Sequence, residues 1–267
     1  MSMNSLNIIK IGGNVIDNSE NLYNFLKDFK DLEGYKILVH GGGKIATQVS
    51  DSLGIESRLV EGRRITDVET LRVVTMVYGG LVNKNIVAQL QRFGTNAIGL
   101  TGADGNLIKA KKRPVKTIDY GFVGDIYDGS VNTKGISDLL KAGFTPVFCA
   151  LTHDGDGQLL NTNADTIASA LAVGMSGVFD TTLIYCFEKK GVLTDINDDE
   201  SVIREIDPQR YEELKIQQII HSGMLPKLDN AFTAIACGVK SVVIGRSDDL
   251  GNITLNKPFG TRLSKNT

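Results

Sequence analysis

Short apolar runs alternate with stretches whose apolar residues recur at helical spacing, and this alternation constrains the fold more than any other feature. The predicted strands are residues 6–11, 36–39, 97–100, 144–149, 182–187, 241–244 and 261–263. The predicted helices are residues 20–32, 44–53, 68–93, 133–142, 164–173, 208–214 and 224–237. Because successive parallel strands need crossover helices that cover the sheet, the pattern predicts an α/β fold, a three-layer αβα sandwich with a mostly parallel central sheet.

The alternation breaks between residues 107 and 130, where Gly121, Gly124 and Gly129 separate short β-type pieces. Residues 60–65 form a second possible hairpin. Hairpins placed over a sheet edge predict a β-hairpin lid over a substrate site. We expect an internal division near residues 175–180, with one continuous sheet spanning both halves.

Composition excludes several classes of protein. The formal net charge of −2 gives no general attraction to nucleic acid or to an anionic membrane surface. No apolar run reaches the roughly 18 residues of a spanning helix, and the N-terminus shows no signal-peptide pattern. Three scattered histidines argue against a Cys/His metal site. Cysteines in apolar stretches predict buried, reduced thiols and a cytoplasmic protein; they are Cys149, Cys186 and Cys237.

Two glycine segments follow predicted strands. Lys10 lies in an apolar strand just before Gly12 and Gly13, so it is either a snorkelling lysine or a cation beside backbone that phosphate can approach. The segment His40–Lys44 contains three glycines between a strand and a helix, which favours an anion cradle over a flexible turn. The chain has neither a Walker P-loop nor a dinucleotide fingerprint, which disfavours a nicotinamide dehydrogenase.

Three polar segments complete the set of motifs. Glu61–Asp67 carries two arginines before the long helix, and one of them could clamp a substrate carboxylate. At the start of the predicted helix 164–173, an N-cap role explains Asn163 but leaves Asn161 unexplained. Ser222–Lys227 places Lys227 in the first turn of a helix, so it is either a surface lysine or a cation that opposes the helix dipole because an anion lies nearby.

Together, and in this order, these motifs resemble the amino acid kinase family from Lys10 to Arg262. The glycine loops alone would admit carbamate kinase or aspartokinase. The segments at 62–66, 121–124 and 161–165 instead resemble the branch that acts on N-acylated glutamate. The resemblance implies an ATP-dependent kinase that phosphorylates the γ-carboxylate of N-acetyl-L-glutamate to an acyl phosphate, in the second step of arginine biosynthesis.

The resemblance also implies roles for individual residues. Lys10 and Lys227 would stabilise the transferring phosphoryl group, and Asp165 would lie between them and orient both. The implied phosphate-binding residues are Gly12, Gly13 and Gly42. The implied acceptor-binding residues are Gly42, Gly43, Arg64 and Asn161, with the 121–124 hairpin approaching the acyl end. The implied nucleotide-binding residues are Glu188, Gly191, Leu193 and Gly223.

Residues 1–175 would then form the acyl-amino-acid-binding lobe and residues 176–267 the nucleotide-binding lobe. No general base is needed, because a glutamate side chain with a pKa of about 4.3 is already ionised at neutral pH. Mg²⁺ would be held largely by the ATP phosphates and water, without a protein metal site. Since the chain begins directly with its first strand, the resemblance implies an arginine-insensitive homodimer, with helix 68–93 as the candidate interface.

One segment departs from the family pattern. Where the family has Thr-Asp-Val-x-Gly, this chain has Glu188 at the aspartate position, followed by Lys189 and Lys190. The longer acid and the new cations could alter nucleotide contacts. The acyl pocket cannot be read from sequence, so N-succinyl-L-glutamate and other carboxylate or carbamate acceptors stay open. A non-catalytic sensor of nucleotide or amino acid is the alternative from a different class.

Overall fold

A computed structural model describes residues 3–220 and 224–265. Within them an eight-stranded sheet has the order β12-β14-β13-β11-β1-β2-β8-β5, and only β13 and β14 pair in antiparallel fashion. Its strands are β1 (Ser5–Ile11), β2 (Tyr35–His40), β5 (Ala97–Leu100), β8 (Thr145–Cys149), β11 (Asp180–Phe187), β12 (Glu205–Ile206), β13 (Ser241–Arg246) and β14 (Thr261–Leu263). The predicted mostly parallel sheet is confirmed.

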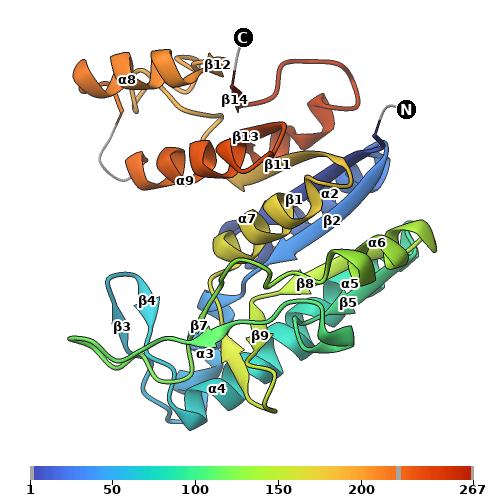
Figure 1. Ribbon diagram of the computed structural model, residues 1–267, viewed down its shortest axis with the longest axis vertical. Helices are drawn as coiled ribbons and strands as arrows, with labels where there is room; N and C mark the ends of the chain where they lie inside the picture. Colours follow the sequence, from blue (N-terminus) through green and yellow to red (C-terminus); the bar gives the residue numbers. More distant parts are fainter. Residues whose placement is uncertain (1–2, 221–223, 266–267) are drawn as a thin grey trace.

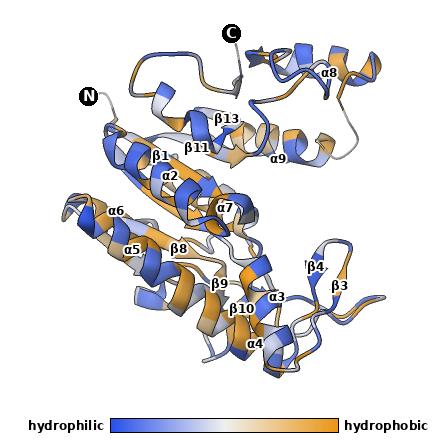
Figure 2. Ribbon diagram, turned by 180° about the vertical axis from the view of Figure 1, so that it is seen from behind, coloured by the Kyte–Doolittle hydropathy of each residue, from blue (hydrophilic) through white to orange (hydrophobic). Residues whose placement is uncertain are grey.

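Helices cover both faces of this sheet. One face carries α6 (Thr133–Lys141), α7 (Ala164–Met175) and α9 (Leu225–Ala236), and α7 lies across β1, β2 and β11 (Figure 1). The other face carries α2 (Ser19–Asp31) and α5 (Asn83–Arg92), which contact each other (Figure 2). The predicted three-layer arrangement is therefore confirmed. Beside β12 lies α8 (Pro208–Ile216), and the 3₁₀ turns are Asp104–Asn106 and Ser247–Asn252.

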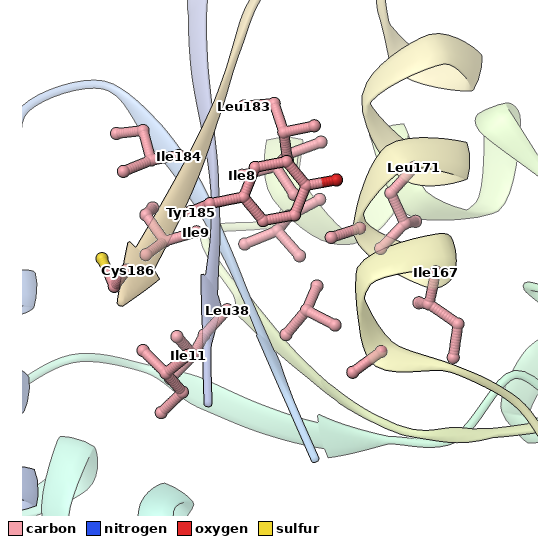
Figure 3. Packing of buried hydrophobic residues seen from close by; sticks show 14 of the residues in the cluster. Ile8, Ile9, Ile11, Leu38, Ile167, Leu171, Leu183, Ile184, Tyr185 and Cys186 are labelled. Carbon is pink, nitrogen blue, oxygen red and sulfur yellow. The ribbon is translucent and has the colours of Figure 1, made fainter. Parts of the chain in front are cut away.

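The central strands are apolar on both sides, as expected for a parallel sheet covered by helices. Side chains alternate between the two faces. Ile8 and Tyr185 lie on the side of α7, whereas Ile9 and Cys186 lie on the opposite side (Figure 3). Because side chains two residues apart share a face, this alternation determines which of the following residues on β1 and β11 lie on the α7 side.

The long helix predicted at 68–93 is present but is not α-helical throughout. It comprises α4 (Val68–Val74), a π-helical segment (Thr75–Val82) and α5. Asp67 caps its start by accepting a hydrogen bond from the backbone N–H of Thr70. Periodicity alone does not reveal a π segment, which is most frequent near functional sites.

Short hairpins lie at the carboxyl edge of the sheet. They are β3 (Leu59–Val60) with β4 (Arg63–Arg64), β6 (Lys111–Lys112) with β7 (Gly124–Asp125), and β9 (Leu151–His153) with β10 (Leu159–Asn161). The third was not predicted, because its second strand was interpreted as a loop before a helix. Gly121 has φ 72°, and a Cβ there would lie 2.2 Å from the carbonyl oxygen of Thr66. Only glycine therefore lets these two segments pack together.

The prediction for the cysteines is partly wrong. Cys149 and Cys186 are buried free thiols, but Cys237 is exposed. Cys237 is the residue at which α9 ends, so its side chain lies at a helix terminus rather than in the core. No helix among the described residues has the length and apolar character needed to cross a membrane.

Candidate active site

The carboxyl ends of β11, β1 and β2 lie side by side, because these strands are adjacent and parallel. In such sheets the crevice beyond the carboxyl ends is the usual ligand site. Three helices begin at this edge: α3 (Gly43–Ser52), α7 and α9. Their free backbone N–H groups and positive dipole ends favour an anion.

Two lysines far apart in sequence converge at this edge. The Lys10 ammonium lies 2.8 Å from a carboxylate oxygen of Asp165. It lies 5.6 Å from the centroid of the Phe187 ring, and the Lys227 ammonium lies 3.8 Å from the same centroid. The structure thus brings together Lys10, Asp165 and Lys227, as the sequence analysis expected.

The Lys227 ammonium is held without a neutralising partner. Burial lowers the pKa of Lys227 and the nearby Lys10 lowers it further, while the carboxylates of Asp165 and Glu188 act in the opposite direction. Among the residues that the structure describes, no side chain or carbonyl forms an ion pair or hydrogen bond with the ammonium group of Lys227. Because Asp165 is already paired with Lys10, the ammonium group of Lys227 stays available to a phosphate.

A cleft of about 340 Å³ opens beside these lysines. Of the expected phosphate and nucleotide residues, its lining includes Gly12, Gly13, Glu188 and Gly191. Leu193 does not line it; this residue is buried and pairs with Val202. Gly223 lies outside the described residues, as do Ser222 and His221.

The two lysines that depart from the family pattern are paired within their own loop. Lys189 lines the cleft, but its ammonium lies 2.9 Å from Asp199. Lys190 pairs with Glu200 and does not line the cleft. The positive charge added by this segment is therefore balanced locally, and Glu188 and Lys189 are the departing residues that line the cleft.

A second pocket of about 260 Å³ is lined by the expected acceptor residues: Gly42, Gly43, Arg64 and Asn161. Its lining also includes Asn163 and Ala164, directly before Asp165, the residue that pairs with Lys10. Both short hairpins that were expected to form a lid contribute residues to it, among them Arg63, Arg113 and Gly124.

Arg64 is a buried cation without an acidic partner. Its guanidinium donates hydrogen bonds to Ser57 (2.7 Å), to the carbonyl oxygen of Gly43 (2.9 Å) and to Thr47 (2.8 Å). Within residues 3–220 and 224–265 no carboxylate pairs with it. A buried positive charge of this kind is costly unless an anion accompanies it, so the arrangement favours a substrate carboxylate.

Neighbouring elements fix the glycine loop after β2. Gly42 has φ 154°, and a Cβ there would lie 3.0 Å from the ring of Tyr78 in the π-helical segment, so glycine is required. His40 is fully buried: Nδ1 lies 2.8 Å from the carbonyl oxygen of Gly41, and Nε2 accepts from Asn83 at 3.0 Å. Burial lowers the pKa of His40 to about 4, so it is neutral at pH 7 and anchors the loop.

Sequence reasoning missed three residues that shape the two pockets. Phe187 was within the segment that departs from the family pattern but was assigned no role, although it lies against both lysines. Tyr78 had no signal beyond a helical apolar pattern. Arg113 lies in the lid interval; it binds Asp125 through Nε and Nη2, while its buried Nη1 has no hydrogen-bond partner.

A parallel sheet whose carboxyl edge gathers lysines, glycine loops and helix N-termini defines an α/β protein of the phosphate-transferring class. The sequence pattern described as the amino acid kinase family matches residues 5–246. The chain belongs to this family, and the prediction that it is a kinase of the family is confirmed.

Individual relatives agree with this assignment. An acetylglutamate kinase from Cytophaga hutchinsonii is 58% identical over 266 residues, covering 99% of this chain and 100% of the relative. An acetylglutamate kinase from Phocaeicola vulgatus is 56% identical and covers 97% and 98% of the two chains. Among solved structures, the smu.665 protein of Streptococcus mutans superimposes with a TM-score of 0.75 at 27% identity, covering 98% and 99%. The resemblance to the acylglutamate branch is thus confirmed.

Proposed function

We propose that the chain transfers the γ-phosphoryl group of ATP to the γ-carboxylate of N-acetyl-L-glutamate, forming an acyl phosphate in the second step of arginine biosynthesis. The observation that carries this proposal is the convergence of Lys10 and Lys227 on the ring of Phe187, which lines the cleft. The name acetylglutamate kinase, which the relatives carry over nearly their whole length, supports the choice of acceptor.

The phosphoryl group would lie beside the two lysines. Lys10 and Lys227 would stabilise the charge that spreads over its oxygens during transfer. Asp165, paired with Lys10 at 2.8 Å, would keep the two ammonium groups apart and oriented. Backbone N–H groups of Gly13 and Gly42 would donate to the same oxygens. Because the attacking carboxylate is already ionised, alignment and electrostatics can supply the catalysis.

The acceptor would lie in the pocket lined by the glycine loop after β2. Arg64, buried and without an acidic partner, would bind the α-carboxylate. Asn161 is held by a hydrogen bond from its amide to Thr66 (2.9 Å), which leaves its carbonyl oxygen for the acceptor's amide N–H. The reacting γ-carboxylate would then approach Gly42 and Gly43 at the positive end of α3.

The same geometry supports separate binding roles for the two halves of the chain. Residues 1–175 would bind the acceptor, since they supply the whole lining of its pocket. Residues 176–267 would bind ATP through the cleft that includes Glu188 and Gly191. In the described part of the chain no three His, Cys, Asp or Glu side chains group to hold a metal. We propose that a Mg²⁺ ion would enter with ATP and be held largely by its phosphates and water.

Hydroxylamine trapping tests the proposal, because it converts an acyl phosphate into a stable hydroxamate. With ATP and Mg²⁺, we expect hydroxamate from N-acetyl-L-glutamate and little from aspartate or carbamate. Omitting Mg²⁺ should remove the signal. ATP binding without product from any acyl amino acid would contradict the proposal and would favour the sensor.

One observation favours N-succinyl-L-glutamate as a second candidate acceptor. Arg113 lines the acceptor pocket from the hairpin expected near the acyl end, and its buried Nη1 has no hydrogen-bond partner. The methyl group of an acetyl substituent has no hydrogen-bond acceptor for this N–H, whereas a succinyl group would supply a carboxylate. The ratio of kcat/KM for the two acceptors in the trapping assay decides between them.

We propose a homodimer formed through the long helix. Its exposed face includes Val68, Met76 and Leu81, each at least half exposed, and a Cβ at Gly80 would meet nothing within 4 Å. Large apolar side chains beside an open glycine suit a closely packed second helix. Sedimentation equilibrium should give twice the chain mass, and Met76→Glu should shift the measured mass towards that of one chain.

A cytoplasmic location is supported by three free cysteines and can be checked by cell fractionation.

A further inference from the structure

An aromatic ring lies where a counter-ion for Lys227 would be expected. The Lys227 ammonium is 3.8 Å from the centroid of the Phe187 ring, and the Lys10 ammonium is 5.6 Å from it. Both distances fall within the range of about 6 Å in which a cation is attracted to the face of a ring. One ring therefore contacts both ammonium groups of the proposed phosphoryl-transfer point.

The ring is held in place from behind. Phe187 lies two residues after Tyr185 on β11 and therefore shares its face, which is the α7 side (Figure 3). The two rings are stacked with centroids 5.9 Å apart. The Tyr185 hydroxyl donates to the carbonyl oxygen of Asp165 at 3.3 Å, and Lys10 lies beside Tyr185 in the sheet register. Phe187 is thus fixed to the strand and helix that carry Lys10 and Asp165.

A carboxylate in place of this ring would change the charge around the two lysines. Asp165 already pairs with Lys10, and a second acid would neutralise Lys227 and repel the incoming phosphates. The face of an aromatic ring attracts an ammonium group but carries no net charge. It can therefore hold two like charges near each other and leave both available to an anion.

We propose that Phe187 is a positioning residue whose ring holds the Lys227 ammonium, and more weakly that of Lys10, at the phosphoryl-transfer point. This inference rests on the proposed kinase reaction and adds a residue to it. Without the ring, Lys227 would turn towards the nearest acids, since both Asp165 and Glu188 attract it. Phosphate would then compete with a carboxylate for the lysine, which raises the barrier to transfer.

Progressive fluorination of the Phe187 ring tests this role, because fluorine weakens the attraction for cations while ring shape changes little. From phenylalanine to trifluorophenylalanine, we expect kcat to fall stepwise by roughly two- to thirtyfold in total. KM for the acceptor should stay unchanged. The matched control is Phe232 on α9, which stacks on Tyr211 and contacts neither lysine; its fluorination should leave kcat unchanged.

A second measurement separates failure of this inference from failure of the proposed function. In enzyme without nucleotide, NMR titration of ¹⁵N-labelled lysine follows Lys227, assigned by comparison with Lys227→Arg. Because the ring favours the charged form, fluorination should lower the pKa of Lys227 further. An unchanged titration, or equal kcat across the series, overturns the inference. Wild-type enzyme that forms no acyl phosphate overturns the kinase proposal, while the titration still reports on the contact.

Discussion

Replacing Lys227 with alanine should lower kcat by about 10²- to 10³-fold, the usual cost of removing one fixed charge or donor from a transition state. KM for the acceptor should change by less than about threefold, because Lys227 lies in the cleft beside Phe187 and not in the acceptor pocket. Steady-state kinetics with the hydroxamate assay measure both quantities.

Lys189 supplies the matched control for this prediction. It lines the same cleft, but its ammonium is paired with Asp199 at 2.9 Å. Lys189→Ala removes the same charge from the same region and should lower kcat by less than about threefold, as expected for an exposed ion pair. If the two variants lost activity equally, general electrostatics of the cleft would explain the effect and the assignment of Lys227 would fail.

Arg64→Ala should raise KM for the acylated glutamate about 100-fold, since charge-assisted hydrogen bonds to a carboxylate are among the strongest in proteins. The effect on kcat should be smaller, because the α-carboxylate is bound equally before and during transfer. The guanidinium also holds the carbonyl oxygen of Gly43. Arg64→Lys keeps the charge but loses the paired N–H donors of the guanidinium, so it should show an intermediate KM.

The neighbouring Arg63 provides the comparison for Arg64. It lines the same pocket but is exposed. We expect Arg63→Ala to change KM by less than about fivefold. Thermal unfolding of both variants separates lost binding from lost packing around Thr47 and Ser57. A KM that rises more for Arg63→Ala than for Arg64→Ala would reassign the carboxylate-binding role.

Most of the fold followed from local patterns. The strands Ala97–Leu100 and Thr261–Leu263 lie where the apolar runs predicted them, and the Asn163 cap of α7 could be predicted from its side chain. These signals are local, since a cap or a period depends on residues within one or two turns. The π-helical stretch at Thr75–Val82 gave no such signal; its Tyr78 lies against Gly42, which is distant in sequence.

The acceptor site could be predicted only in part from the sequence. Arg64 and Asn161 could be proposed from motifs, but the burial of Arg64 and its lack of an acidic partner appear only in three dimensions. Arg113 reaches the pocket because the two lid hairpins pack on Thr66 through Gly121. Leu193, implied by the family pattern, instead packs away from the cleft beside Val202.

The sequence by itself determined the layered architecture and the glycine loops and pointed to the two candidate lysines, because each leaves a local pattern or a family motif. Only the tertiary structure decided that Lys10 and Lys227 meet over the ring of Phe187. The physical reason is that β1 and β11 are parallel neighbours in the sheet, although more than half of the chain separates them in sequence. Strand pairing over that separation sets distances between side chains that no local pattern encodes.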